Sequence, residues 1–234
     1  MDETTSRRDA ARTLGIAWVL LTLGVLAVGW LLTHPLADAV DPWDNDVNRW
    51  FADQRTSGLD VAADIGSKIA DTVVGLALAA VLAGVVSRWQ RSWRPAVYYA
   101  VLVAGTLALY LVVTQLVPRD RPPVKILDPG LVPDHSFPSG HVATAVVVYA
   151  GTALLLGAYV PRWRSRLWPL FLVPLVVVPS RLYQGAHHPT DVLTSLVFAP
   201  IWLGVVARVL LADVRQAGRT TETEGTRSGS STGS

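Results

Sequence analysis

The sequence predicts an all-α membrane protein, a six-transmembrane helix bundle with a short amphipathic extracytoplasmic segment. Of its 234 residues 51% are hydrophobic and 16% are charged, and the mean hydropathy is +0.37, which is too apolar for an ordinary soluble domain. Six runs contain no charged residue: 14–33, 72–87, 96–117, 142–160, 167–180 and 192–207. The length fits a single domain, so we expect one membrane domain over residues 14–212.

The first apolar run follows a polar N-terminal segment. Residues 1–13 carry Arg7, Arg8 and Arg12, and the 20 residues that follow are enough to cross the hydrocarbon core of a bilayer. A cleaved signal peptide is the alternative, but the run is long for one and no small-residue cleavage site closes it. We therefore expect a first transmembrane helix here.

The fifth run and the C-terminal tail differ from the other segments. Residues 167–180 are few for a lipid-facing helix and include Pro169, Pro174 and Pro179, so the sequence leaves the ends of this span open. Residues 213–234 are rich in Thr, Ser, Gly and Glu and have no apolar period, which predicts a disordered tail.

Residues 34–71 form a polar, acidic stretch between the first two runs. Val47, Trp50 and Phe51 are spaced as on one face of a helix, which predicts a short amphipathic helix. Such a helix can lie on the membrane surface or pack against the end of the bundle. The sequence favours neither alternative.

Basic residues gather on one side of the six predicted spans. The N-terminus, the loops 88–95 and 161–166 and the C-terminal end share that side, and they hold 13 of the 20 Lys and Arg residues. Because cytoplasmic loops are enriched in Lys and Arg, we expect a multi-pass protein of the cell membrane with both termini in the cytoplasm. The net charge is only +2 and no basic stripe is interleaved with aromatics, so a nucleic-acid partner is not expected. The absence of cysteine excludes disulfides and thiolate chemistry.

Residues 180–191 gather chemically capable side chains in a short segment. Arg181 offers a planar fork of donors that suits phosphate oxygens. A neutral histidine such as His187 can act as a nucleophile when an acceptor holds its other ring nitrogen. Asp191 follows His187 by four residues, so the two share a face if the chain is helical from there.

A second segment, Pro138-Ser139-Gly140-His141, precedes an uncharged apolar run. Ser139 is suited to cap the helix, and Gly140 permits a close approach of the backbone. The N–H groups at a helix start form an anion site, beside which His141 can serve as a general acid.

These segments resemble the type-2 phosphatidic acid phosphatases, whose relatives include bacterial acid phosphatases and vanadium haloperoxidases. The family pattern is K-x6-R-P, then P-S-G-H, then S-R-x5-H-x3-D. The matching residues are Arg121, Pro122, Pro138, Ser139, Gly140, His141, Ser180, Arg181, His187 and Asp191. Thr114 stands where the family has lysine, so one expected cation is missing. Arg119, which we favour, or Lys125 can compensate as further phosphate-binding residues, and a plain surface role for each stays open.

The resemblance implies a mechanism without metal or cofactor. His187 attacks phosphorus and becomes a phosphohistidine, Asp191 holds its other ring nitrogen, and His141 protonates the leaving oxygen. The residues that bind the phosphoryl oxygens are Arg121, Ser139, Gly140 and Arg181. All of them fall on the extracytoplasmic side, so the expected partners are the bilayer and a lipid phosphate or diphosphate of its outer leaflet.

The resemblance also sets the alternatives. A polyprenyl diphosphate such as undecaprenyl diphosphate is the expected substrate, with phosphatidylglycerol phosphate and phosphatidate as alternatives. A vanadium haloperoxidase shares the anion site, but six spans without a soluble domain argue against it. A non-catalytic transporter or binding protein would not need His141, His187 and Asp191 together. We expect structural or surface roles for His188 and His135, and leave Ser180 open between packing and function.

Overall fold

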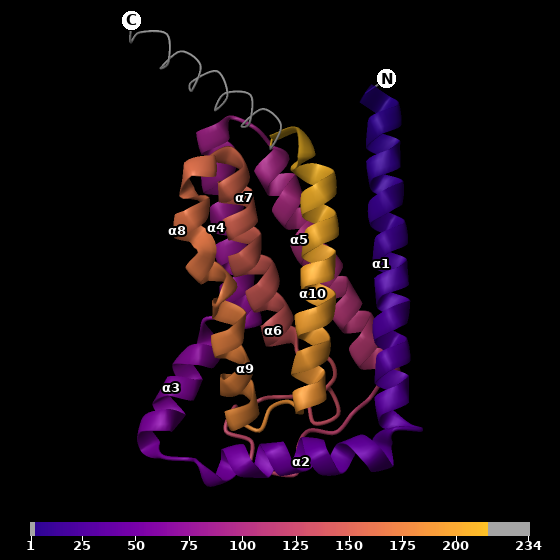
Figure 1. The fold of residues 1–234 in the computed structure, drawn as a ribbon, viewed down its shortest axis with the longest axis vertical. Helices are drawn as coiled ribbons and strands as arrows, with labels where there is room; N and C mark the ends of the chain where they lie inside the picture. Colours follow the sequence, from indigo (N-terminus) through magenta and orange to yellow (C-terminus); the bar gives the residue numbers. More distant parts are fainter. Residues whose placement is uncertain (1–2, 215–234) are drawn as a thin grey trace, which may run out of the picture.

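The computed structural model describes residues 3–214, which form an upright bundle of helices (Figure 1). Within this range the chain has no strand, only an isolated bridge between Arg119 and His135. Six helices are long and apolar enough to cross a membrane. The prediction of an all-α, six-helix membrane protein is confirmed. The tail predicted to be disordered lies, from residue 215 onward, outside the described residues.

Four of the spans are single regular helices, namely α1 (Glu3–Thr33), α4 (Thr72–Gln90), α5 (Arg94–Leu116) and α10 (Pro189–Leu210). A fifth, Gly140–Tyr159, consists of α6 (Gly140–Ala145), a π-helical turn (Val146–Ala150) and α7 (Gly151–Tyr159). The helix α1 takes in much of the polar segment that we had separated from the first span. It packs into the bundle, where Trp18 Nε1 donates to the Gly105 carbonyl at 2.8 Å.

The span around the predicted run 167–180 is broken into short pieces. It comprises two 3₁₀ turns (Pro161–Trp163 and Trp168–Phe171), α8 (Arg164–Leu167) and α9 (Val173–Tyr183). Pro161, Pro169 and Pro174 each stand in the first two positions of a piece. Proline has no N–H and is best tolerated in a first turn, which explains the restarts at these three residues. Pro179, by contrast, lies inside α9.

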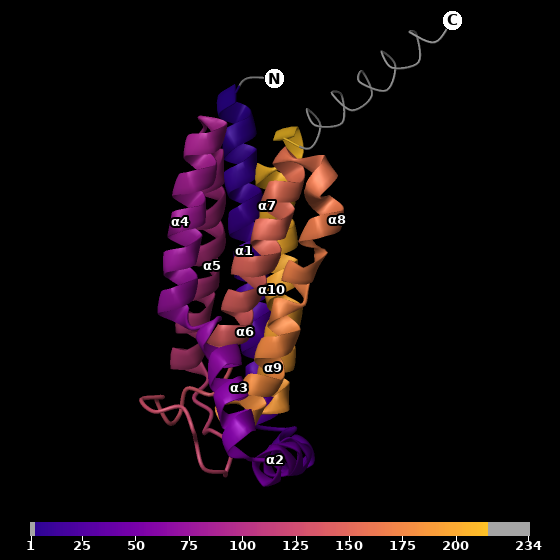
Figure 2. The same ribbon diagram turned by 90° about the vertical axis from the view of Figure 1, so that its left-hand side faces the viewer.

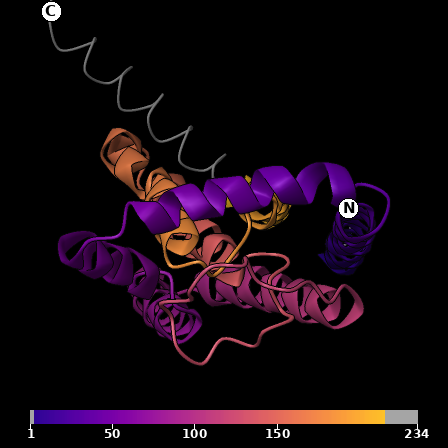
Figure 3. The same cartoon turned by 90° about the horizontal axis from the view of Figure 1, so that it is seen from below.

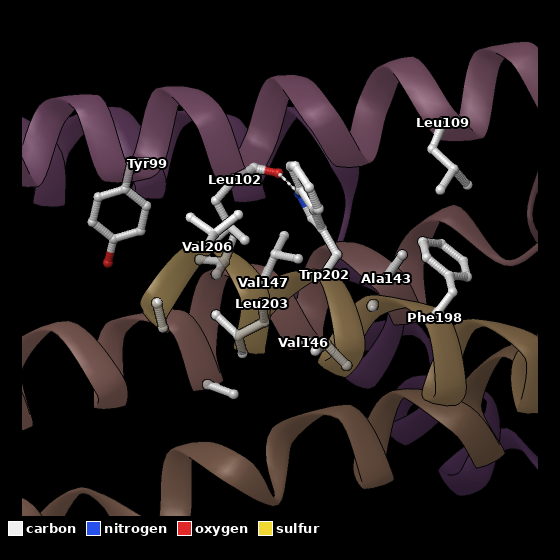
Figure 4. Packing of buried hydrophobic residues seen from close by; sticks show 14 of the residues in the cluster. Tyr99, Leu102, Leu109, Ala143, Val146, Val147, Phe198, Trp202, Leu203 and Val206 are labelled. Atoms are coloured by element: carbon white, nitrogen blue, oxygen red, sulfur yellow. Dashed lines mark hydrogen bonds between the residues drawn. The ribbon is translucent and has the colours of Figure 1, made fainter. Parts of the chain in front are cut away.

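Side chains of α5, α10 and the π-helical turn form the centre of the main core (Figure 4). Trp202 is 3% exposed, and its Nε1 donates to the Leu102 carbonyl at 3.1 Å. Its ring lies so close to Gly105 that any larger residue there would overlap it. In a bilayer, close packing and hydrogen bonds of this kind hold helices together because lipid tails are as apolar as the core.

The two ends of the bundle differ. Figure 1 shows the N-terminus and the end of α10 at one end, and Figure 2 shows the loop 117–139 at the other. There α2 (Ala37–Asp53) lies crosswise over the bundle, as Figure 3 shows, and α3 (Ser57–Lys68) leads back to α4. Asp44 and Asn48 of α2 are fully buried, whereas Trp43 and Trp50 are 51% and 58% exposed. The helix therefore packs on the bundle and still turns large aromatic side chains outward.

Candidate active site

The loop 117–139 is folded back on itself by backbone hydrogen bonds. Arg119 N donates to the Asp134 carbonyl at 2.9 Å, Ser136 N donates to the Arg119 carbonyl at 3.0 Å, and Arg121 N donates to the Pro133 carbonyl at 3.1 Å. The start of α6 is in turn tied to α10, because Ser195 Oγ donates to the Ser139 carbonyl at 3.0 Å. All three motif segments therefore meet at the end of the bundle opposite the termini.

Ser139 and Gly140 begin the helix α6. Ser139 is its N-cap residue, as the sequence predicts, but its side chain caps nothing. The buried Ser139 Oγ has no hydrogen-bond partner among the described residues. A Cβ at Gly140 would lie 3.2 Å from the Tyr110 ring, so the close approach that this glycine permits is to an aromatic side chain.

Arg181 is fully buried and uses only part of its guanidinium. Its Nη1 donates to Ser67 Oγ (2.6 Å), Asp128 Oδ2 (2.7 Å) and Gln184 Oε1 (2.9 Å). Its Nε and Nη2 are buried without a partner in the described part of the chain. Because an unpaired donor in a buried site costs about 1–3 kcal/mol, such donors point to a ligand.

Arg121 is anchored by carbonyl groups. Its Nε donates to Val132 O at 2.9 Å, Nη2 donates to His135 O at 3.1 Å, and Nη1 donates to Ala186 O. Burial, and next the charge of Arg181, lower the pKa of Arg121, which places the two cations near each other. Each terminal nitrogen of Arg121 keeps a second hydrogen for an anion.

The hydrogen bond of His187 assigns its tautomer. Its Nδ1 lies 2.7 Å from the Ser136 carbonyl, which can only accept, so Nδ1 carries the proton and Nε2 keeps a free lone pair. Burial, followed by the charges of Arg181, Arg121 and His141, lowers the pKa of His187 well below its ordinary value. The ring is therefore neutral near pH 7 and its Nε2 can act as a nucleophile.

We predicted that Asp191 would hold the ring of His187, and this is wrong in detail. Asp191 Oδ2 is 3.9 Å from His187 Nδ1, too far for a hydrogen bond. It accepts instead from Ser136 Oγ at 2.5 Å and from His188 N at 2.7 Å. The reason is that α10 begins only at Pro189, so His187 lies before the helix, and the Asp191 side chain caps the start of the helix. Asp191 is therefore linked to His187 through Ser136, whose hydroxyl donates to the carboxylate and whose carbonyl accepts from Nδ1.

His141 stands one residue inside α6, with its side chain 15% exposed. Its Nε2 is 4.0 Å from Asp71 Oδ2, a carboxylate that caps α4 through the N–H groups of Val73 and Val74. Its charge is among those that act on His187, so the two rings face the same site.

Two residues, Arg119 and Lys125, could supply the cation that is missing at Thr114. Arg119, which we favoured as the compensating cation, donates Nη1 to Asp191 Oδ1 (2.7 Å) and Nη2 to Asp44 Oδ2 (2.8 Å), which argues against a phosphate-binding role. The Thr114 hydroxyl donates to the Tyr110 carbonyl of its own helix at 3.0 Å. Lys125 is exposed on the loop. Binding an anion with Arg119 would require breaking buried ion pairs, which costs about 3–5 kcal/mol.

The remaining motif neighbours have structural contacts. The buried His188 is the N-cap of α10, and its Nε2 lies 3.2 Å from the Asp120 carbonyl; burial lowers its pKa. His135 lies 3.8 Å from the exposed Asp134. Ser180 Oγ donates to Val176 O at 3.0 Å and lies against Gly66, so small size is what its position requires.

Sequence reasoning missed several residues that hold the site. They are Asp44, Ser67, Asp128, Ser136 and Gln184. Ser67 and Asp44 come from the acidic stretch, which carries no motif. Ser136 acts on His187 through its main chain, which no side-chain pattern reveals. Only their meeting with Arg119, Arg181 and His187 in the fold identifies them.

Comparison with known proteins agrees with this architecture. The family model of the PAP2 superfamily matches residues 95–215, and the chain belongs to that superfamily. The fold is similar to the crystal structure of a transmembrane PAP2 type phosphatidylglycerolphosphate phosphatase from Bacillus subtilis, with a TM-score of 0.66, 21% identity, and coverage of 86% of this chain and 96% of the other. Undecaprenyl-diphosphatase BcrC of Bacillus subtilis (strain 168) is 37% identical over 102 residues, 42% of this chain. The match spans 49% of that relative's length.

Proposed function

We propose that the protein is an integral-membrane lipid phosphatase that works through a phosphohistidine on His187. One observation carries the proposal. Buried donors that have no partner within residues 3–214, namely Arg181 Nε and Nη2 and Ser139 Oγ, occur in the same site as a neutral His187 whose Nε2 keeps its lone pair. Donors of this kind suit the oxygens of a phosphoryl group, and the ring nitrogen suits its phosphorus.

Binding and attack follow from this arrangement. Arg181 and Arg121 share the negative charge of the phosphoryl oxygens, with Ser139 Oγ and the N–H of Gly140 at the start of α6. His187 Nε2 then forms a bond to phosphorus while the bond from phosphorus to the leaving oxygen breaks. That oxygen is the ester oxygen of a lipid monophosphate or the bridging oxygen of a lipid diphosphate. His141 gives its proton to that leaving oxygen. The positive charge on the phosphorylated ring is balanced by Asp191, 3.9 Å from Nδ1.

Hydrolysis completes the cycle. His141, now neutral, takes a proton from water, whose oxygen attacks phosphorus as the bond to His187 Nε2 breaks. Inorganic phosphate leaves, and both histidines return to their starting state. Throughout, the Ser136 carbonyl keeps the proton of His187 on Nδ1. Each step uses a residue of the motif segments. In this mechanism protein side chains and backbone N–H groups bind the phosphoryl group and transfer the protons.

For the substrate we propose a polyprenyl diphosphate, with undecaprenyl diphosphate as the first candidate, because the similar BcrC is named for it. Phosphatidylglycerol phosphate and phosphatidate are the alternatives. A small apolar cavity of about 50 Å³ is lined by Leu76, Leu107, Tyr110 and Gly140 among others. Its volume is too small for a lipid chain, so the cavity does not distinguish among these substrates.

We also propose that the site faces outward and that both termini are cytoplasmic, as the distribution of arginines indicates. The chain has no cysteine, so single cysteines can be labelled without background. An impermeant thiol reagent applied to intact cells is expected to label Asp134→Cys and Asp46→Cys but not Ser165→Cys. All three positions are exposed. The reverse pattern would place the site in the cytoplasm and exclude outer-leaflet substrates.

The activity is tested by measuring phosphate release from each of the three lipids in proteoliposomes. We expect release by the wild type, inhibition by vanadate, and a phosphohistidine trapped by rapid quenching. His187→Ala should abolish all turnover, whereas His34→Ala, on the exposed end of α1, should not. Halide oxidation in the presence of vanadate would indicate a haloperoxidase. Phosphate binding without hydrolysis would indicate a binding protein.

A further inference from the structure

We propose that Asp44 and Arg119 are positioning residues, through which the crosswise helix α2 sets the geometry of the Asp191–Ser136–His187 chain. This inference rests on the proposed function of His187 as nucleophile. It gives a role to α2, a helix outside the matched PAP2 segment. It also gives a role to Arg119, which sequence reasoning had placed among the phosphate ligands.

The first link joins α2 to the start of α10. Asp44 is fully buried and accepts three hydrogen bonds at its two oxygens. Its Oδ1 accepts from Thr190 N at 3.1 Å, and its Oδ2 accepts from Thr190 Oγ1 at 2.5 Å and from Arg119 Nη2 at 2.8 Å. His188 Nδ1 lies 4.0 Å from Oδ2, beyond hydrogen-bond distance. Asp44 therefore fixes the turn that contains the nucleophile's neighbours.

The second link joins Arg119 to Asp191. Arg119 Nη1 donates to Asp191 Oδ1 at 2.7 Å and to Thr190 Oγ1 at 2.7 Å. Burial by itself lowers the pKa of Arg119, but the carboxylates of Asp191 and Asp44 outweigh it, and the pKa is raised. The guanidinium is thus a permanent cation held between two buried carboxylates.

The third link reaches the nucleophile. With Oδ1 of Asp191 held by Arg119, Oδ2 is directed to Ser136 Oγ at 2.5 Å. The carbonyl of the same Ser136 accepts from His187 Nδ1 at 2.7 Å. Ring orientation and tautomer therefore depend on a continuous chain of contacts that begins on α2. A bidentate guanidinium suits this task because its fork fixes the two carboxylates relative to each other.

Asp41 provides a matched control on the same helix. It lies three residues before Asp44 and also contacts Arg119 Nη2, at 3.1 Å. Its side chain is 47% exposed, while that of Asp44 is fully buried. An exposed pair of this kind contributes about 0–1 kcal/mol. If α2 acts only through its general charge, the two aspartates are equivalent; if it acts as a positioning element, only Asp44 matters.

The experiment compares Asp44→Asn with Asp41→Asn in proteoliposomes, with undecaprenyl diphosphate as substrate. We expect kcat of Asp44→Asn to fall by about 10- to 100-fold, the usual loss when an orienting partner is removed, with KM changed by less than about threefold. Asp41→Asn should stay within about twofold of wild type in both parameters. Equal losses in the two variants, or a wild-type kcat in Asp44→Asn, would overturn the proposal.

Arg119→Lys tests the link itself, and it also covers the case in which Asp44→Asn fails to fold. Lysine keeps the charge but cannot fork between Asp44 and Asp191. We expect a similar loss of kcat, and the double variant Asp44→Asn/Arg119→Lys should be no slower than the slower single variant. Losses that multiply would show that the two residues act separately and would overturn the proposal.

A spectroscopic readout separates this inference from the proposed function. In ¹⁵N-histidine-labelled protein, His187 should be the Nδ1–H tautomer in the wild type and in Asp41→Asn. In Asp44→Asn and Arg119→Lys the Nε2–H tautomer should appear. This readout needs no turnover, so it holds even if no lipid phosphate proves to be a substrate. An unchanged His187 spectrum in both variants contradicts the positioning role whatever the substrate.

Discussion

The site contains two buried arginines in neighbouring regions, and the protein uses them in opposite ways. Both terminal nitrogens of Arg119 are paired with carboxylates, Asp191 on one and Asp44 with Asp41 on the other. Arg181 directs one terminal nitrogen to three acceptors and leaves Nε and Nη2 without a partner in the described chain. One guanidinium is a structural cation, and the other has donors available for a ligand.

The difference shows that a charge near a motif is not enough to predict anion binding. Arg119 is two residues from Arg121 and seemed well placed to replace the family's lysine. Its charge is already neutralised by buried carboxylates, so an approaching phosphate would be repelled by them as much as attracted by it. What decides the role is which donors the fold has already occupied.

The largest expected effect comes from removing the available donors. Arg181→Ala should lower kcat/KM by about 10²–10³-fold, as for the loss of a preorganised donor to a developing anion. KM should rise and kcat should fall, because the same donors bind the ground state and the transition state. Arg119→Lys, by contrast, should lower kcat and leave KM unchanged. The check is steady-state kinetics on both variants in the same liposomes. If Arg119→Lys raises KM and leaves kcat unchanged, Arg119 is a substrate ligand.

The second prediction concerns pH. After burial, the Arg181 charge is the largest cause that lowers the pKa of His187. Removing that cation in Arg181→Gln makes protonation easier, so the pKa of His187 should rise toward its ordinary value. More of the ring is then protonated, and not nucleophilic, at a given acid pH.

Rapid-quench measurement of phosphohistidine formation between about pH 5 and 8 tests this. The acid limb should move to higher pH in Arg181→Gln and keep its position in Arg119→Lys, whose charge is unchanged. If neither variant moves the limb, the acid dependence belongs to another group or to the substrate phosphate.

The smallest effect is expected at the position of the missing lysine. Thr114→Lys adds a flexible cation near the end of α5, and one further charged hydrogen bond would raise kcat/KM by up to about tenfold. Lys125→Ala should change it by less than about twofold, because the side chain is exposed. Phosphate-release kinetics on these variants suffice. No change in Thr114→Lys would mean that Arg121 and Arg181 provide all the positive charge that the site needs.

The fold was largely predictable because transmembrane helices are a local property of the chain. An uncharged run of about 20 residues matches the thickness of a bilayer wherever it occurs. The predicted span 72–87 falls inside α4, and the predicted span 192–207 falls inside α10. The span 96–117 is close to the bounds of α5. The broken span Pro161–Tyr183 was the least certain because its prolines permit several restarts. For the stretch 34–71, the period of apolar residues predicted a helix but not which face it buries.

The motif segments were also readable, since their spacing is a linear pattern. The sequence by itself determined the six helices and indicated the candidates His141, Arg181 and His187. The tertiary structure alone decided which acceptor holds His187, that Asp191 caps α10, and that Arg119 pairs with Asp44 and Asp191. Those outcomes depend on contacts such as Arg119 with Asp44, 75 residues away, and Arg181 with Ser67, 114 residues away. Which acceptors a hydrogen-bond donor meets depends on the residues that surround it in the folded protein. In this protein those residues come from distant parts of the chain, so a local sequence pattern cannot identify them.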